Sequence, residues 1–353
     1  MSGSYVYDAR FYTDSQTTDQ SHQVNLRMDH EFSKRYKLAL NESFVVAQEP
    51  TIIDPTVVSS PLRTSGNNIR NTGQADFTAE LTKEFDLHLG YANTFYAYKQ
   101  LGGDEAPPYS YPSRSADLDR MEQLATIDLR WKIVPETTGV FGYQYGHVNY
   151  TSPEYIITTA PYGTGNYSSG PGDKSNIRND DEHFAFVGAD EQFNPDLNGS
   201  IRVGAEYLDY YNAGTSKLSP YADASLTYQY MPKSSAQLGV KEVHNSTDVT
   251  GIIAADPVLD EQSTAVYLNI NHQITDRFTG SLLGQAQWST FNGGGPGYNG
   301  QGEDFYIVGL NFAYHFNPWL LTEAGYDYSK LNSEIYDRSY TRNQVYLGFR
   351  ATY

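Results

Sequence analysis

The sequence predicts an all-β fold, a transmembrane antiparallel up-and-down β-barrel of about 16 strands. Three observations predict it: apolar and polar residues alternate along most of the chain, short turns alternate with long polar loops, and the alternating segments are long enough to cross a bilayer. The pattern continues from about Tyr5 to Tyr353 without a break, so we expect a single barrel domain over residues 1–353.

The alternation is clear in the segment 23–32, where the apolar residues, from Val24 to Phe32, occupy even positions and the residues between them are polar or charged. After a polar turn at 33–35 the alternation resumes at Tyr36, which is typical of a hairpin with one apolar and one polar face. Six more hairpins follow, with turns at Asp86, 134–136, 194–196, 231–234, 276–277 and 317–319. One strand before the hairpins and one closing strand after them complete the predicted count.

The connections between the hairpins are long and rich in Gly, Pro, Ser, Asn and Asp. They are predicted at 47–73, 100–117, 151–181, 211–219, 244–261, 292–303 and 331–340. Short turns at one end and long polar loops at the other are typical of transmembrane barrels. An even number of strands then places both chain ends on the short-turn side.

A soluble β-sandwich would show the same alternation in any one strand. The strands predicted here are commonly about 10–13 residues long, against a globular mode of about 5–6, and a tilted strand needs about 9–11 to cross a bilayer. Aromatic residues near the short turns also suit a membrane interface, although aromatics favour strands in general. They are Phe32, Tyr36, Phe85, Phe193, Tyr228, Tyr230, Phe278, Phe316 and Trp319.

Composition excludes several classes of protein. The 353 residues include 42 acidic and 24 basic side chains, 31 Tyr and no Cys, and the formal charge is −18. Without Cys there is no disulfide framework, thiolate metal site or cysteine nucleophile. The negative charge makes nucleic acid an unsuitable partner, and no apolar run is long enough for a spanning helix.

The polar face of the predicted strands carries many charges, which would be costly to bury dry and therefore favour a water-filled lumen. Acidic groups outnumber basic ones on this face, so we expect a mild preference for cations, although each residue could simply solvate the wall or pair with a neighbour. The pore-lining candidates are Arg27, Asp29, Asp76, Glu80, Arg120, Glu122, Asp128, Arg130, Arg202, Glu206, Asp223, Lys241, Glu323, Asp327, Arg342 and Arg350, with Asp8, Arg10 and Glu31 beside them.

Features of an enzyme are weak. The chain has no G-x-S-x-G or H-E-x-x-H motif, and we expect no catalytic residue, cofactor or metal. The run 179–183 could bind a hard cation, but a solvated loop end is the simpler interpretation. The loop 151–181 could fold into the lumen or remain outside it, and the sequence leaves both open.

Two features of the sequence resemble those of a known family. One is the closing strand "NQVYLGFRATY", which has Val345, Leu347 and Phe349 on one face and ends in the aromatic Tyr353. The other is the pair of Asn-Pro turns at 194–195 and 317–318. The chain resembles bacterial outer-membrane β-barrel porins, in particular the putative β-barrel porin families. The resemblance implies an outer-membrane location with periplasmic short turns and termini, contact with lipid and lipopolysaccharide, and recognition of the last strand by the barrel-assembly machinery. Tyr353 departs from the usual terminal Phe.

We therefore expect a passive aqueous channel for small polar solutes and ions. A dedicated conduit for exported polysaccharide and a surface-binding or structural barrel are the alternatives, and assembly into a homo-oligomer stays open. A saccharide conduit should show a ladder of aromatic side chains in the lumen. Aromatics predicted to point inward are Tyr96, Tyr98, Phe184, Phe186, Tyr221, Tyr267 and Tyr346.

Overall fold

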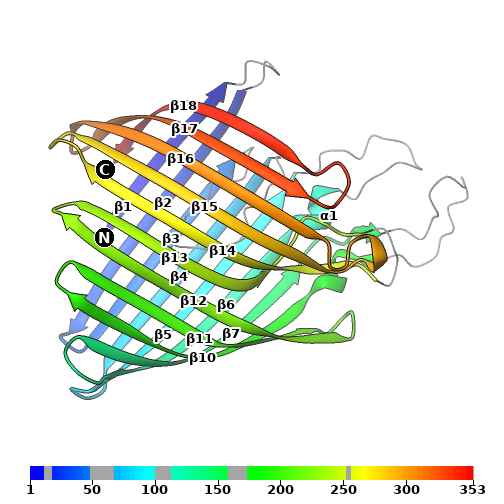
Figure 1. Ribbon diagram of the computed structural model, residues 1–353, viewed down its shortest axis with the longest axis horizontal. Coiled ribbons are helices and arrows are strands. Elements are labelled where there is room, and N and C mark those ends of the chain that lie inside the picture. The colour runs from blue at the N-terminus through cyan, green and yellow to red at the C-terminus, as the bar shows by residue number, and fades with distance from the viewer. Residues whose placement is uncertain (12–17, 48–66, 100–112, 158–172, 252–255, 353) are drawn as a thin grey trace, which may run out of the picture.

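A closed antiparallel barrel of 16 strands forms the molecule in the computed structural model, so the predicted fold class and strand count are confirmed (Figure 1). The structure describes residues 1–11, 18–47, 67–99, 113–157, 173–251 and 256–352. No helix within these ranges has the length and apolar character needed to cross a membrane.

The strands of the barrel are β1 (Ser2–Phe11), β2 (Thr18–Ser33), β3 (Tyr36–Ala47), β4 (Asn68–Glu80), β5 (Phe85–Tyr98), β6 (Arg120–Lys132), β7 (Thr137–Tyr150), β10 (Asp180–Asn194), β11 (Leu197–Tyr210), β12 (Thr215–Met231), β13 (Ser234–Asn245), β14 (Val258–Gln273), β15 (Phe278–Gly293), β16 (Gly302–Asn317), β17 (Leu320–Ser333) and β18 (Tyr340–Thr352). Shorter elements lie in the connections: α1 (Arg114–Leu118), β8 (Tyr155–Ile157), β9 (Asp173–Lys174), η1 (Ser175–Arg178) and η2 (Gly295–Gly297).

The barrel closes through its first and last strands. β1 pairs with β18 in antiparallel register, with Tyr5 opposite Ala351 and Tyr7 opposite Phe349. Both chain ends lie at the end of the barrel that carries the short turns (Figure 1). Closure pairs every strand on both sides, which removes the exposed edges that an open sheet would present to lipid.

One short turn differs from its prediction. The turn predicted at Asp86 lies at 81–84, and Asp86 already belongs to β5. The Thr82 hydroxyl accepts hydrogen bonds from the backbone amides of Glu84 and Phe85 and so sets the turn earlier in the chain. The apolar residues on either side hid this hydroxyl turn in the alternation pattern.

Several strands extend further toward the loop end than predicted. The loop predicted at 211–219 is a tight turn, because the amides of Ala213 and Gly214 both donate to the Tyr210 carbonyl. Gly214 has a φ of 67°, a conformation that glycine adopts without strain. β12 therefore begins at Thr215.

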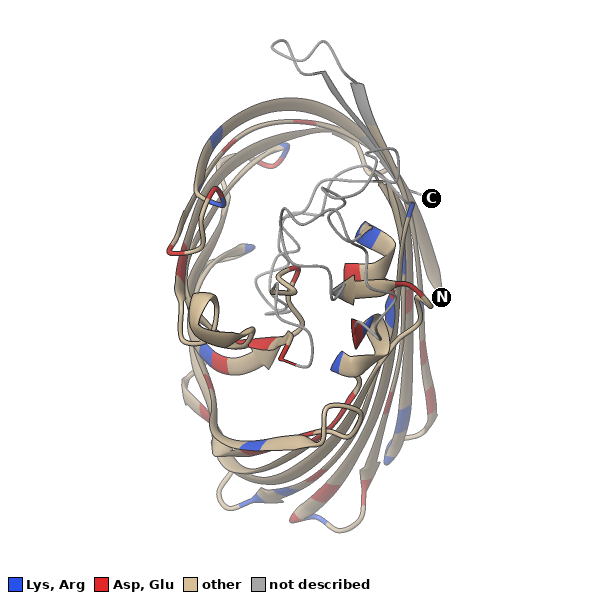
Figure 2. Ribbon diagram, turned by 90° about the vertical axis from the view of Figure 1, so that its right-hand side faces the viewer, with Lys and Arg blue, Asp and Glu red and all other residues tan. Residues whose placement is uncertain are grey.

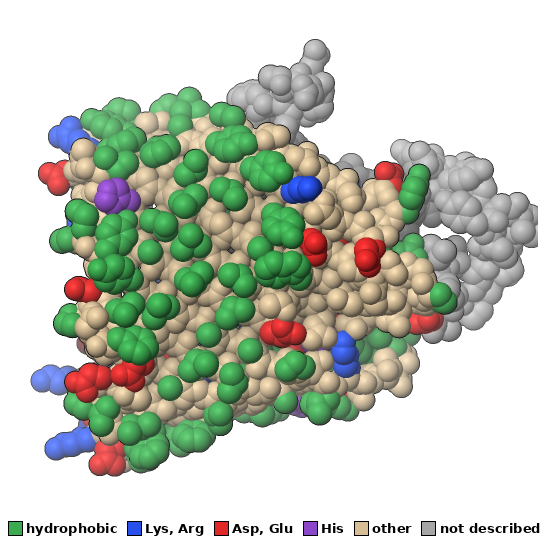
Figure 3. Space-filling model, in the orientation of Figure 1, with side chains coloured by type: hydrophobic (Ala, Val, Ile, Leu, Met, Phe, Trp, Pro, Cys, Tyr) green, Lys and Arg blue, Asp and Glu red, His purple; other side chains and the backbone are tan. Residues whose placement is uncertain are grey.

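Large apolar and aromatic side chains cover the outer face of the barrel (Figure 3). Trp319 and Phe193, beside two of the short turns, are 62 % and 60 % exposed, and Val345, Leu347 and Phe349 on the closing strand are exposed as well. An exposed apolar belt on a closed barrel is the surface that lipid chains cover.

Aromatic rings on the inner face lie over glycines of the neighbouring strand. A Cβ added to Gly239 would lie 2.2 Å from the Tyr267 ring, and one added to Gly325 would lie 2.2 Å from the Tyr346 ring. Each glycine is the register partner of its ring. Glycine here leaves room for the ring against the backbone, an arrangement that pins strand register.

Filling one of these positions is expected to destabilise the barrel. In Gly142→Ala the new methyl would lie 2.2 Å from the Phe186 ring, so the ring or the strand must move, at a cost of about 1–3 kcal/mol. Gly284→Ala is the matched control, because no atom lies within 4 Å of its Cβ position. Urea unfolding in liposomes measures both variants, and an equal loss of stability in the two would contradict the packing described here.

Candidate functional site

Charged side chains pair across strands on the polar face of the barrel wall. Asp190 on β10 accepts hydrogen bonds from Arg130 on β6 at 2.5 Å and from Arg202 on β11 at 2.7 Å. The bond to Arg130 crosses over β7, which lies between β6 and β10 in the barrel. This trio therefore ties several strands together as well as placing charge on the wall.

A second trio centres on His88 of β5. Its Nε2 lies 3.1 Å from Asp76 Oδ1 on β4 and its Nδ1 lies 3.5 Å from Asp128 Oδ2 on β6. The ring thus lies between carboxylates of the two strands that flank it. Each ring nitrogen of His88 can therefore interact with a carboxylate, and a proton on the ring can face either Asp76 or Asp128.

The remaining pore-lining candidates are distributed over the whole wall. Three of them lie beside an oppositely charged side chain: Arg27 pairs with Asp29, Arg120 pairs with Glu122, and Glu80 lies 4.0 Å from Arg35. Glu323 accepts a hydrogen bond from Asn311, and Asp327 lies over Gly309. In the strand register Asp223 lies between Arg202 and Lys241, and Arg342 is opposite Ser329. The side chains of Asp8, Arg10 and Arg350, and all of Tyr353, lie outside the described residues. Their role in a pore stays a prediction.

Water exposure of these charges changes along the barrel. The side chains of Arg27 and Asp29, toward the short-turn end, are 60 % and 58 % exposed. Glu206 and His244, toward the loop end, are 0 % and 1 % exposed. The charged wall is therefore open to water toward the short turns and shielded from it around Glu206 and His244.

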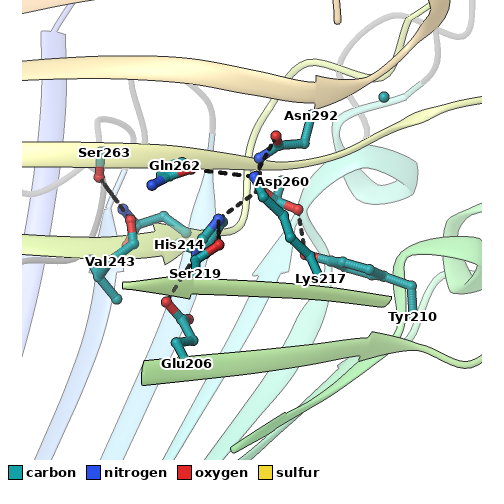
Figure 4. A network of polar contacts seen from close by, with 12 residues as sticks. Glu206, Tyr210, Lys217, Ser219, Val243, His244, Asp260, Gln262, Ser263 and Asn292 are labelled. Carbon is teal, nitrogen blue, oxygen red and sulfur yellow. Dashed lines mark hydrogen bonds and ion pairs between the residues drawn. The ribbon is translucent and has the colours of Figure 1, made fainter. Parts of the chain in front are cut away.

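The buried charges at the loop end form a network that crosses several strands (Figure 4). Glu206 Oε2 lies 2.9 Å from His244 Nδ1, and His244 Nε2 lies 3.4 Å from Ser219 Oγ and 4.0 Å from Asp260 Oδ1. Tyr210 donates to Asp260 at 2.5 Å. These side chains bond to one another where water is excluded, and within the described residues Glu206 Oε1 alone of this carboxylate's oxygens has no partner.

Sequence reasoning missed His244 and Asp260 as wall residues, because it assigned 244–261 to a loop. In the structure His244 lies within β13 and Asp260 within β14. Where both faces of a strand end carry polar residues, its sequence has the composition of a loop. The alternation itself would have assigned both to the outer face with Val240 and Val266, so only the contacts with Glu206 and Tyr210 reveal their place in the network.

Ser219, His244 and Glu206 have the connectivity of a hydrolase triad. All three are buried in the wall, and Ser219 lies within β12, whose backbone amides serve the strand ladder. Backbone amides engaged in this ladder are not free to stabilise an oxyanion. The geometry favours a structural network.

Segments of the loops fold inward at the loop end of the barrel. Figure 2 looks at this end and shows short helical segments inside the ring of strands. η1 contacts both β7 and β14, which are separated in the barrel by β10, β11, β12 and β13. The described parts of 113–119 and 151–181 thus form an insert at the mouth of the lumen, here called the inner insert.

Arg178 is the centre of the inner insert. Its guanidinium is fully buried, donates to the carbonyl of Thr247 at 2.9 Å and to that of Asp117 at 2.5 Å, and stacks 4.3 Å over the Tyr150 ring. These contacts join η1 to α1, to β7 and to the connection after β13. One buried cation therefore holds four separate parts of the chain together.

Hydroxyl groups complete the inner insert. Ser113 caps α1 by accepting from the Ala116 amide at 3.0 Å, and its hydroxyl donates to Glu154 at 2.5 Å. Ser175 donates to the Ala116 carbonyl at 2.5 Å. Ala116 and Ile156 pack as a small apolar core beneath these bonds.

Burial raises the pKa of Asp117 in α1 to about 7, although Arg178 nearby acts to lower it. Its Oδ1 has no hydrogen-bond partner within the described part of the chain. Protonation removes the cost of burying this charge. The docked insert therefore binds a proton more tightly than an undocked one.

The inner insert is expected to loosen as the pH rises. A raised carboxyl pKa stabilises docking fully below the ordinary value of 3.8, and this contribution is lost as the pH rises through about 7. Since the chain lacks Cys, the labelling rate of Ala116→Cys reports opening. We expect the rate to rise between pH 5 and 8 relative to the same variant carrying Asp117→Asn. An identical pH dependence in both backgrounds would show that Asp117 does not control docking.

The run 179–183 is not a solvated loop end. Asn179 and Asp180 are buried, Asp180 begins β10, and Asn179 accepts from the Tyr150 amide at 2.8 Å. Among the residues that the structure describes, no group of His, Asp and Glu side chains converges to hold a metal ion. The alternative of a hard-cation site gains no support from this geometry.

Comparison with protein families identifies the barrel. A family model described as "Putative beta-barrel porin 2" matches residues 122–353. The chain belongs to this family. It is thus a porin-type barrel of the bacterial outer membrane, as the resemblance of its closing strand and turns implied.

Solved structures of outer-membrane proteins resemble the chain at low identity. The loop L8 deletion mutant of OmpT from Vibrio cholerae has 10 % identity and a TM-score of 0.45, over 100 % of this chain and 97 % of that one. The FrpB iron transporter from Neisseria meningitidis has 11 % identity and a TM-score of 0.48, over 94 % and 58 %. No curated protein sequence matches the chain.

Proposed function

We propose that this porin-family barrel is a passive channel for small polar solutes and ions with a mild preference for cations. The observation that carries the proposal is the contrast between its two faces: an exposed apolar outer wall and a charged inner wall whose short-turn half is open to water. A charged wall needs no other compensation where water reaches it.

In this proposal the short turns and both termini face the periplasm and the long loops face the exterior. Solute entering from the outside meets the inner insert first, and then the more solvated charges around Arg27 and Asp29. The insert narrows the loop end, so permeation should be restricted to small molecules. The excess of acidic over basic groups in the chain supports the preference for cations.

Swelling of liposomes that contain the refolded protein tests this function. We expect swelling with pentoses, slower swelling with disaccharides, and swelling with lysine hydrochloride faster than with sodium glutamate. Empty liposomes and liposomes with heat-unfolded protein are the controls. Swelling with none of these solutes would refute a diffusion channel.

Export of a polysaccharide is the second candidate, because the rings of Tyr267 and Tyr346 lie against the inner wall over Gly239 and Gly325. Rings in this position could present their faces to passing sugars. Tyr267 is buried, which weakens this interpretation. Block of conductance by linear oligosaccharides, weakened in Tyr346→Ala, would favour it over the diffusion channel.

A further inference from the structure

We propose that the outer wall of the barrel binds a zwitterionic phospholipid whose head ends in an ammonium group. The site consists of an apolar groove for one acyl chain and a polar rim on the loop side of that groove. Both lie on the outward faces of strands between β5 and β11. The inference goes beyond the proposed channel and does not depend on the passage of solutes.

The groove has a volume of about 570 Å³, within the range of about 300–1,000 Å³ typical of ligand pockets. Apolar and aromatic residues line it. Ala185 is the smallest outward side chain among them, whereas Phe141 and Val187 beside it are 51 % and 53 % exposed. The hollow at Ala185 belongs to the apolar belt that lipid covers, so an acyl chain can fill it through dispersion contacts.

Hydrogen-bond donors lie directly on the loop side of the groove. Tyr143, which lines the groove, has its hydroxyl 2.7 Å from His183 Nδ1. With the hydroxyl as the donor, the proton of the neutral ring is on Nε2, from which it can be donated to a ligand. The rings of Tyr145 and Tyr207 flank His183, with centroids 5.4 and 6.2 Å away. These groups suit the ester and phosphate oxygens of a phospholipid, which are acceptors next to its acyl chains.

Carboxylates form the next level of the rim toward the loops. Asp181 precedes His183 by two residues on the same outward face and is the register partner of Asp209 on β11. Side chains opposite each other in a sheet have Cβ atoms about 4.5–5.5 Å apart, and like charges in this position repel. The Tyr145 hydroxyl and His147 Nδ1 lie 2.7 and 2.8 Å from Asp181 Oδ1, so Oδ2 can accept from a ligand. An ammonium group between the two carboxylates would remove the repulsion.

The order of these groups along the strands matches the order of groups in the ligand. From the middle of the wall toward the loops, β7 and β10 present apolar side chains, then hydroxyl and imidazole groups, then a carboxylate. A zwitterionic phospholipid presents an acyl chain, then ester and phosphate acceptors, then an ammonium group. The lipid would therefore lie along the wall with its head toward the loops.

The charge of the rim favours an ammonium head over an anionic one. The outward row that crosses the rim contains no Lys or Arg and consists of Gln123, His147, Asp181, Asp209 and Ser216. His147 can balance one of the two acidic charges at most. The Tyr211 ring stacks on His147 with centroids 6.4 Å apart and adds an aromatic face that an ammonium can approach.

A second copy of the chain fits this site less well. A two-fold contact places the same patch on both partners. It would set the hollow at Ala185 against another hollow and the rim carboxylates against carboxylates, which is unfavourable.

Native mass spectrometry of the refolded barrel in a neutral glycoside detergent, with dioleoylphosphatidylethanolamine added, tests the groove. We expect one retained lipid per wild-type barrel. Ala185→Phe fills the hollow and should lower retention at least about tenfold, because the chain loses its packing contacts. Ala324→Phe is the matched control, since Ala324 is also exposed but lies on β17, away from the groove. Heat-modifiable migration on gels confirms folding of each variant.

Lipid preference tests the polar rim. The wild type should retain dioleoylphosphatidylethanolamine at least about tenfold better than dioleoylphosphatidylglycerol, since an ionic hydrogen bond is worth about that factor. Asp181→Asn/Asp209→Asn should abolish the preference. Glu136→Gln/Asp196→Asn removes the same charge from exposed short turns and should keep it.

The lipid series on the wild type does not depend on the folding of any variant. Equal retention of the two phospholipids, preferential retention of rough lipopolysaccharide, or equal retention by Ala185→Phe and Ala324→Phe would each overturn the inference. Wild-type dimers that Ala185→Phe dissociates would overturn it in favour of a second copy. A barrel that retains the ethanolamine lipid but carries no current would refute the channel function and leave this site intact.

Discussion

Replacing Arg178 with alanine is expected to raise the single-channel conductance severalfold. The buried guanidinium holds η1 to the carbonyls of Asp117 and Thr247 and to the Tyr150 ring. Losing charged hydrogen bonds worth about 1.5–3 kcal/mol each should undock the inner insert while leaving the strand ladder in place. The mouth of the lumen would then be wider.

Lys174→Ala is the matched control for this variant. Lys174 lies four residues earlier and is exposed, and its ammonium lies 5.5 Å from the centre of the Tyr155 ring. We expect its conductance to equal that of the wild type. If Arg178→Ala conducts like Lys174→Ala while its inner segments become protease-sensitive, the insert is not what restricts the current.

Leu310→Arg is expected to impair insertion into lipid, and Asn311→Arg is expected to be tolerated. The two positions are adjacent on β16 but face opposite sides: Leu310 is exposed on the outer wall, whereas Asn311 donates to Glu323 on the polar face. An arginine on the lipid face near the bilayer midplane costs about 2–4 kcal/mol. An arginine at 311 would gain Glu323 as a partner.

Refolding into liposomes under a urea titration measures this pair of variants. Using neighbouring residues on one strand keeps the substituent and the depth in the membrane similar. Loss of stability in Leu310→Arg alone would support the assignment of faces. Greater damage from Asn311→Arg would mean that the apolar face of β16 does not meet lipid.

Much of the barrel could be predicted from the sequence, because side-chain period and turn spacing are local properties. The parity of Val24 and Tyr36 fixed the outer face of the first hairpin, and both side chains are exposed in the structure. The strand count followed from the repeated hairpins. Asp86 was misplaced because a threonine hydroxyl, and not a break in apolar character, sets that turn.

The loop end could not be predicted in the same way, since its contacts join distant parts of the chain. α1 is only five residues long, too short to show helical periodicity. The bond from Arg178 to Thr247 spans 69 positions. Pairing partners such as Arg130 and Asp190 were each assigned to the polar face, but only the closed barrel brings them together across β7.

Single-channel recording of the refolded wild type in a planar bilayer, under a gradient of potassium chloride, tests the central claim most directly. A passive channel with an acidic lumen should give discrete conductance steps and a reversal potential displaced toward that of potassium. Absence of steps from protein that is folded by gel migration, or a reversal potential displaced toward that of chloride, would contradict the account.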